Sequence, residues 1–149
     1  MILGDHFPRE ERTKFFRNGF RPGRIYYLHC TFTRPRKNKF VLVACVDPEP
    51  VVLLINSRVN EFVQRRPPLA RCQVAIDEAS HGFLRHDSFI DCSAAFPMDF
   101  VEIERQVLDD TSAVRGSASP SVIDQVCAAV KLSSGIARRH REWILVGLC

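Results

Sequence analysis

The chain has 149 residues and a formal net charge of +4, with 46% hydrophobic and 26% charged residues. This length suits a single domain, 1–149, whose core needs no metal or disulfide to hold it. No apolar run approaches the roughly 18 to 20 residues that span a bilayer, and no signal-peptide pattern opens the chain. We therefore expect a cytoplasmic protein without a membrane segment.

The first element in the chain is a charged helix over residues 9–20. Phe15, Phe16 and Phe20 can share one side of it, and Gly19 with the following Pro22-Gly23 ends it. Residues 1–21 are thus expected to form an N-terminal helical extension.

Three strands follow, with continuous apolar character: residues 25–31, 40–46 and 51–56. The two prolines of Asp47-Pro48-Glu49-Pro50 forbid one long strand and predict a turn. Short links between neighbours predict an antiparallel meander. Because apolar residues are continuous rather than alternating, both faces of this sheet should be covered, as in a small barrel with a helix outside it.

The second half of the chain predicts three more strands and a helix. After a loop or short helix at 58–71, the strands are expected at 72–77, 86–92 and, more weakly, 100–107. Ser119 can cap a helix and Pro120 suits its first position. The tail 137–149 is basic and then apolar, and should pack on the core or on a second subunit. The fold class is mainly β with helices (α+β): a barrel over 22–118, then a C-terminal helix and tail over 119–149.

The cysteines give no sign of a metal site. Structural zinc usually needs closely spaced ligand pairs, and no C-x-x-C pair is present. Scattered single cysteines are typical of buried small hydrophobes in a reducing compartment. We expect no metal and no cofactor. These cysteines are Cys30, Cys45, Cys72, Cys92, Cys127 and Cys149.

The run from Thr33 to Lys39 holds four cations in seven residues, between the first two predicted strands. A hairpin there would crowd Arg34, Arg36, Lys37 and Lys39 at one exposed tip. Such a cluster favours a polyanion, most commonly nucleic acid, because each neutralised phosphate releases condensed counterions. A solvated loop with no partner is the alternative interpretation.

Four segments follow one another in a recognisable order within a span of roughly residues 22 to 135: Pro22–Tyr26, Lys39–Val43, Asp87–Ile90 and Val114–Ser119. In this order they resemble the MazF/PemK family of toxins from bacterial toxin–antitoxin pairs. The resemblance implies a small SH3-like antiparallel barrel that cuts single-stranded RNA without a metal, acts as a homodimer, and is neutralised by an antitoxin protein.

In that family an arginine in the hairpin region and a Thr or Ser at the end of the next strand share the chemistry. The matching positions here are Lys39 and Ser57, and Arg36 can reach in from the loop. The resemblance thus implies a catalytic group of Arg36, Lys39 and Ser57. Lys39-Phe40 departs from the family's Arg-Pro, and a lysine lacks the bidentate fork of a guanidinium.

The remaining candidates would hold the RNA. Arg34 and Lys37 would position its backbone, and Arg24 and His86 are further RNA-binding candidates. The aromatic side chains of Tyr26, Tyr27 and Phe32 could stack on unpaired bases or belong to the core.

Other functions remain open at this stage. The chain could be a catalytically inactive module that binds nucleic acid or a protein, or a structural protein that dimerises through Trp143–Leu148. A serine hydrolase using His86, Asp87 and Ser88 is disfavoured, because neighbours on one strand point to alternating faces. Asp87 and Ser88 should instead bind backbone groups near the end of the sheet.

Overall fold

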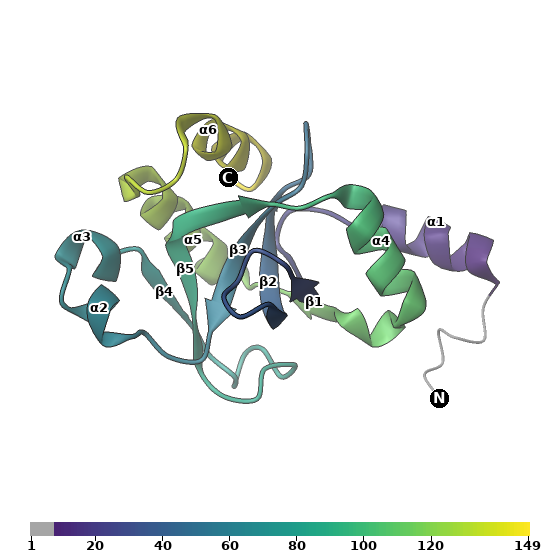
Figure 1. The fold of residues 1–149 in the computed structure, drawn as a ribbon, viewed down its shortest axis with the longest axis horizontal. Coiled ribbons are helices and arrows are strands. Elements are labelled where there is room, and N and C mark those ends of the chain that lie inside the picture. The colour runs from purple at the N-terminus through teal and green to yellow at the C-terminus, as the bar shows by residue number, and fades with distance from the viewer. Residues whose placement is uncertain (1–7) are drawn as a thin grey trace.

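The computed structural model describes residues 8–149 as a six-stranded antiparallel sheet, curled into a half barrel and flanked by helices (Figure 1). The fold is α+β, with a helix at each end of the described chain, as the sequence predicts. No helix in this range is long and apolar enough to cross a membrane. The strands are β1 (Arg24–Cys30), β2 (Lys37–Cys45), β3 (Val51–Asn56), β4 (Gln73–Ile76), β5 (Ser88–Pro97) and β6 (Val114–Ser117). The helices are α1 (Arg9–Gly19), α2 (Glu61–Gln64), α3 (Pro67–Ala70), α4 (Phe100–Asp109), α5 (Pro120–Leu132) and α6 (Arg138–Gly147), with a 3-10 turn at Thr111–Ala113.

The predicted meander β1-β2-β3 is confirmed and forms the centre of the sheet, whose order is β4-β5-β3-β2-β1-β6. Tyr27 pairs with Phe40, which in turn pairs with Ile55. The strands expected at 72–77 and 86–92 are also confirmed as β4 and β5, and β5 runs on to Pro97.

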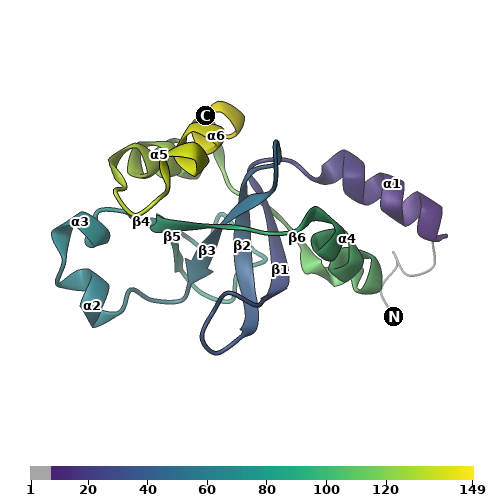
Figure 2. The same cartoon turned by 45° about the horizontal axis from the view of Figure 1, so that its top comes forward.

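Both faces of the sheet are covered at its centre, as the continuous apolar strands predict. Alternate residues of each strand point to opposite faces. Leu42 and Leu53 pack under α5 and α6, whereas Val41 and Val52 pack under α1 and α4. Figure 2 shows these two helix pairs on opposite sides of the strands. The sheet therefore separates two apolar cores.

The loop between β4 and β5 joins the two edges of the curled sheet. His81 is buried, and its Nε2 accepts a hydrogen bond from the backbone N–H of Ser119 at 3.0 Å. The Phe83 ring lies so close to Gly116 of β6 that a Cβ there would be 2.7 Å from it. The loop thus spans from the β4 edge to β6 and the start of α5, which closes the half barrel on that side.

Helix α5 begins as predicted, because the Ser119 hydroxyl accepts a hydrogen bond from the Val122 N–H at 3.3 Å and Pro120 takes the first position. Helix α1 is confirmed with one correction. Phe16 and Phe20 are buried, but Phe15 is 76% exposed and does not share their side.

The sixth strand predicted at 100–107 is wrong, because this segment is helix α4. The Asp99 carboxylate accepts from the Val101 N–H at 3.3 Å and caps the helix. Ile103 and Val107, one turn apart, are buried against α1 and β1, which is a helical rather than a strand periodicity.

The sixth strand is instead the short β6, which pairs with the first residues of β1. Beyond that pairing, the side chain of Gln106 in α4 occupies the edge of β1. Its Oε1 accepts from the N–H of His29 at 2.8 Å, and its Nε2 donates to the carbonyl of His29 at 3.2 Å. The amide thus satisfies both backbone groups of one strand residue.

The cysteine prediction is confirmed for Cys30, Cys45, Cys72 and Cys92, which are buried free thiols. It is wrong for the other two, because Cys127 of α5 and the last residue, Cys149, form a disulfide. The apolar tail packs on the core as expected: Ile144 is buried and Trp143, Leu145 and Leu148 pack against the same cluster. Val146 is 87% exposed.

A bulge in β5 depends on close packing from the segment that follows α5. Val52 and Leu54 of β3 pair with Phe96 and Asp91, so four residues of β5 lie opposite one of β3. A Cβ on Gly135 would overlap the carbonyl oxygen of Ser93 within this bulge. Only a glycine permits this approach of the two backbones.

We expect Gly135→Ala to lower the free energy of unfolding by about 1–3 kcal/mol, since the added methyl group meets backbone rather than a flexible side chain. The measurement is urea denaturation followed by circular dichroism. Gly82→Ala is the matched control, because a Cβ at Gly82 meets nothing within 4 Å. Equal stabilities for the two variants would contradict this account of the bulge.

Candidate nucleic-acid interface

The basic loop 31–36 connects β1 and β2 and is tied to the sheet at both ends. The Thr33 hydroxyl lies 3.1 Å from the carbonyl of Cys30 and accepts from the N–H of Lys37 at 3.2 Å. Phe32 stacks on Phe96 of β5, with ring centroids 4.4 Å apart and planes 10° apart. The loop is therefore folded toward β5 and anchored there.

Arg34, Arg36 and Lys37 are all exposed on or beside this loop, as predicted. Lys39 is not at the tip, which corrects the expectation of four crowded cations. It lies within β2, half-buried, and its Nζ donates a hydrogen bond to Oδ1 of Asn56 on β3. Three cations therefore face solvent at the loop, and a fourth is held on the sheet.

Lys39 shares a face with Val41 and Val43, the face that α1 and α4 cover elsewhere. Toward β4 this face is open, and its side chains are half-buried or exposed. We call four of its polar side chains the Lys39 patch: Lys39, Asn56, Gln73 and Asp91.

Asp91 is the acidic member of the Lys39 patch and is firmly held. Its Oδ1 accepts from Nε2 of Gln73 at 2.8 Å and from the N–H of Ser93 at 2.9 Å. These bonds fix the start of the β5 bulge. The position of the patch is thus set by the same packing that requires Gly135.

Burial lowers the pKa of the Lys39 ammonium, and the charge of Lys37 lowers it further, against smaller opposing effects of Cys30 and Asp91. Burial also raises the pKa of the Cys30 thiol to about 11. The Cys30 thiol is therefore uncharged at neutral pH. Lys39 is a cation that gives up its proton more readily than an exposed lysine does.

Ser57 is exposed directly after the end of β3, where a hydroxyl can reach a ligand. The segment that follows brings more positive charge. In it, the Arg66 guanidinium lies 3.5 Å above the ring of Phe62, which is itself 58% exposed. Arginine stacked on an exposed ring is a surface suited to unpaired bases, and Phe62 was not among the sequence candidates.

His86 is exposed just before β5, and its neighbours serve the backbone as predicted. Oδ1 of Asp87 accepts from the N–H of Glu78 at 2.9 Å, and the hydroxyl of Ser88 donates to the carbonyl of His86 at 3.1 Å. Ser88 is buried. The Ser88 hydroxyl also lies 3.3 Å from Nδ1 of His86, but that nitrogen lies 3.1 Å from the backbone carbonyl of Asp87 and not from its carboxylate, so the three side chains do not form the relay of a serine hydrolase.

Strand direction brings most of the candidates to one end of the sheet. In this antiparallel arrangement, β1, β3 and β4 end where β2 and β5 begin. The basic loop, Lys39, Ser57 and His86 all lie at this end. Arg24 does not, because it begins β1 and lies about 20 Å away along the strand.

At the distant end, Arg24 lines a hollow of about 350 Å³ with Phe15, Phe16 and Tyr26. Tyr26 is fully buried among these rings and cannot stack on a base. Phe32 is likewise engaged with Phe96. Tyr27 and Phe32 are both half-buried, and Tyr27 is the one of the three that is neither fully buried nor stacked on Phe96.

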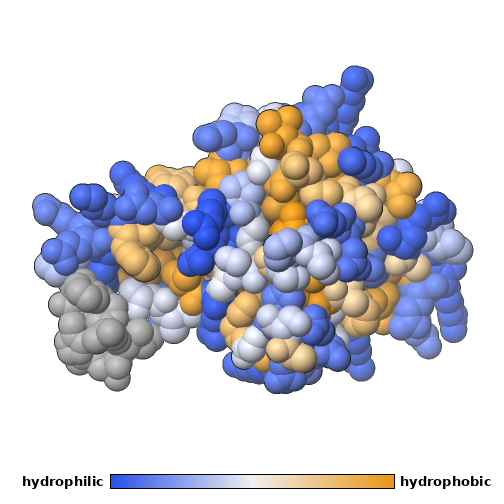
Figure 3. Space-filling view, turned by 180° about the vertical axis from the view of Figure 1, so that it is seen from behind, coloured by the Kyte–Doolittle hydropathy of each residue, from blue (hydrophilic) through white to orange (hydrophobic). Residues whose placement is uncertain are grey.

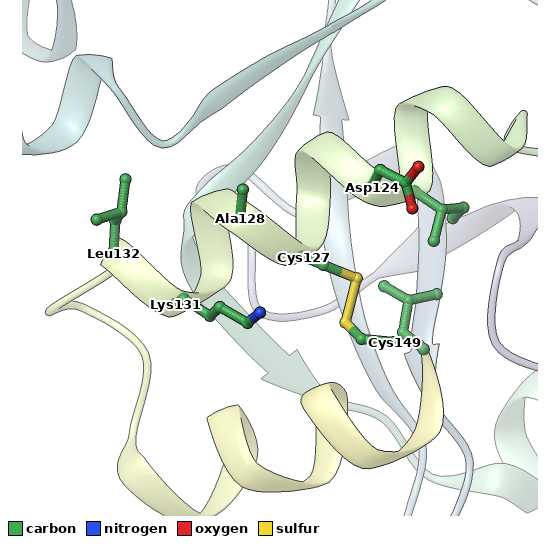
Figure 4. Close-up of a pocket in the computed structure, with 8 residues that line it drawn as sticks. Asp124, Cys127, Ala128, Lys131, Leu132 and Cys149 are labelled. Atoms are coloured by element: carbon green, nitrogen blue, oxygen red, sulfur yellow. A yellow bond between two sulfur atoms is a disulfide. The ribbon is translucent and has the colours of Figure 1, made fainter.

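A larger hollow of about 560 Å³ lies beside the disulfide, between α5 and the end of α6 (Figure 4). Ala128, Leu132 and Lys131 line it, and none of the candidate RNA-binding or catalytic residues does. Seen from behind, apolar surface is spread over the middle of the molecule between hydrophilic ends (Figure 3). Within residues 8–149 no group of three or more His, Cys, Asp or Glu side chains could hold a metal ion.

Comparison with known proteins gives no further assignment: no protein-family model and no curated protein matches this chain.

We expect Lys39→Met to leave the free energy of unfolding unchanged, or to raise it by up to about 1 kcal/mol. The ammonium is penalised by partial burial, though its remaining contact with water keeps the effect small. The exposed Lys131→Met on α5 is the control. A loss of more than about 1 kcal/mol would instead give Lys39 a structural role.

The same variant should depend on pH in a defined direction. The pKa of Lys39 in the native state lies below its pKa in the unfolded chain. At pH values between these two pKa values, the unfolded state therefore binds more protons than the native state does. Wild-type stability therefore gains on that of Lys39→Met as the pH approaches 10.5. Urea unfolding at about pH 7 and about pH 10 measures the difference.

Proposed function

We propose that this protein binds single-stranded RNA at the loop end of its sheet and cleaves it without a metal ion, in the manner of MazF/PemK toxins. One observation carries the proposal: strand direction gathers Arg34, Arg36, Lys37, Lys39 and Ser57 at one end of the sheet, beside the open Lys39 patch. Like those toxins, it would act as a homodimer and be neutralised by an antitoxin protein.

The cationic loop suits the RNA backbone. Arg34 and Lys37 are exposed and can each neutralise a phosphate, which releases counterions. The side chains of the face beside them are half-buried or exposed, and the exposed ring of Phe62 with its stacked arginine lies in the segment that follows Ser57. Unpaired bases fit such a surface better than a duplex does, because their faces are free to stack.

The reaction that fits these groups is attack of the ribose 2′-oxygen on the adjacent phosphorus. The P–O5′ bond then breaks, which leaves a 2′,3′-cyclic phosphate and a 5′-hydroxyl. The 2′-hydroxyl proton passes to water. Arg36 would stabilise the charge on the phosphorane, and the Ser57 hydroxyl would donate to one of its oxygens.

Lys39 suits the remaining task, protonation of the departing 5′-oxygen. Its lowered pKa makes the ammonium a better acid than an exposed lysine, while the hydrogen bond to Asn56 holds the amine in place. Water then restores the proton. Where the family has an arginine that binds phosphate, this chain would thus have a lysine that acts as an acid. The bidentate contact to the phosphate would come from Arg36 instead.

The test is incubation of an end-labelled unstructured RNA with purified protein in the presence of EDTA. We expect cutting to a 5′-hydroxyl product that polynucleotide kinase can label directly. The rate should fall about a hundredfold or more for Arg36→Ala and Lys39→Ala, and about tenfold for Ser57→Ala. The matched DNA should stay whole, because it lacks the attacking 2′-hydroxyl.

Arg138→Ala and Ser121→Ala are controls of the same residue types, both exposed and both on helices away from the loop. They should cut as wild type does. RNA that remains whole at enzyme excess would refute the nuclease, and so would equal cutting by all the variants at Arg36, Lys39 and Ser57.

A binding module without catalysis is the second candidate, and the Lys39–Asn56 contact favours it. The amine already has a partner, and no guanidinium stands at the position where the family has one. This function predicts RNA binding that weakens steeply with salt, and no cleavage product.

A further inference from the structure

Three residues on the opposite face of the sheet from Lys39 form a group that the proposed function does not use. Tyr27 and Phe40 are paired across β1 and β2, with ring centroids 4.9 Å apart. The guanidinium carbon of Arg115, on β6, lies 5.1 Å from the Tyr27 ring and 5.7 Å from the Phe40 ring. We call these three residues the Arg115 subsite.

The charge of Arg115 is not neutralised within residues 8–149. It forms no ion pair or hydrogen bond there, and its Nε, like those of Arg12, Arg24 and Arg141, is buried without a partner. Arg105, by contrast, is bound by both Glu102 and Asp109. Aromatic rings hold a guanidinium by their negative faces but leave its N–H donors unused. Because Arg115 as a whole is only half-buried, the donors of its guanidinium that reach the surface can meet an anion, the acceptor that suits an arginine fork.

The neighbouring pair on the same face supplies further polar groups. His29 and Asn38 are exposed, about 7 Å further along the strands, with Nδ1 of His29 3.1 Å from Oδ1 of Asn38. The other imidazole nitrogen and the amide N–H₂ remain for a ligand. The basic loop with Arg34 and Arg36 comes next along the chain. Aromatic rings, a free guanidinium and donors in one row match a nucleotide, with its phosphate on the arginine.

We propose that the Arg115 subsite binds one nucleotide of the RNA strand, with the phosphate on Arg115 and the base beside Tyr27, Phe40 and His29. This inference rests on the proposed function, because the ligand is the same RNA. The strand would then pass around the basic loop from the Lys39 patch on one face to Arg115 on the other. Arg115 is a binding residue in this arrangement and takes no part in bond cleavage.

The experiment measures the affinity of a short fluorescein-labelled, unstructured RNA by fluorescence anisotropy over a series of salt concentrations. Arg115→Gln should weaken binding about tenfold and reduce the slope of log affinity against log salt by about one, the loss of one phosphate contact. Arg139→Gln is the matched control, because Arg139 also lies over an aromatic ring, 5.8 Å from that of Trp143, but on α6. It should change affinity less than about twofold.

Wild-type affinity for Arg115→Gln, together with lost binding by an Arg34→Ala, Arg36→Ala double variant, would overturn the subsite and leave the proposed function standing. Absence of RNA binding by wild type even at low salt would overturn both. If Arg115→Gln does not fold, as circular dichroism would show, Arg115→Lys replaces it. That variant keeps the charge without the fork and should bind about threefold more weakly; unchanged affinity would count against the subsite.

Discussion

The pairing of β2 with both β1 and β3 is the interaction on which the rest of this molecule depends. Strand β2 places Leu42 in one apolar core and Val41 in the other, so a single backbone ladder positions the helices on both sides. The same alternation continues to the start of the strand, where helix cover ends. There it sends Lys39 to one face and Phe40 to the other. The pairing register of β2 therefore determines both polar surfaces at this end of the sheet. A shift of β2 by one residue would move Lys39 and Phe40 to each other's face.

Much of this fold can be predicted from local signals in the sequence. Proline pairs, capping residues and apolar runs gave the hairpin, β3 and α5, because each signal acts within a few residues. The prediction for segment 100–107 was wrong because, over so short a length, its apolar residues fit both the helical and the strand period. The cap at Asp99 favours the helix. Strand β6 has four residues, none of them buried, and becomes a strand only by pairing with β1 far away in the chain. The disulfide likewise depends on α6 returning to α5.

In the candidate interface, too, some features could be predicted from local sequence and others depend on contacts between distant segments. The sequence showed that cations gather near residues 33–39, and strand direction then brought Ser57 and His86 to the same end. It did not show that β2 begins early enough to take Lys39 out of the loop, since a polar strand end has no apolar signature. Asn56, Asp91 and Arg115 matter only through residues from other strands. Arg24 looked equivalent to the loop cations because one-dimensional proximity says nothing of which end of a strand a residue occupies.

The Gln106 side chain has a consequence for how this protein behaves among its own copies. An unpaired stretch of strand offers its N–H and C=O groups to any passing chain, and short β6 leaves the second half of β1 in that position. The two hydrogen bonds between the Gln106 amide and the backbone of His29 occupy the N–H and C=O groups of that residue with a side chain that cannot be extended into a further strand. Helix α4 thus hinders the pairing of this β1 edge with a strand of another copy. The edge lies next to the surface where RNA is proposed to bind.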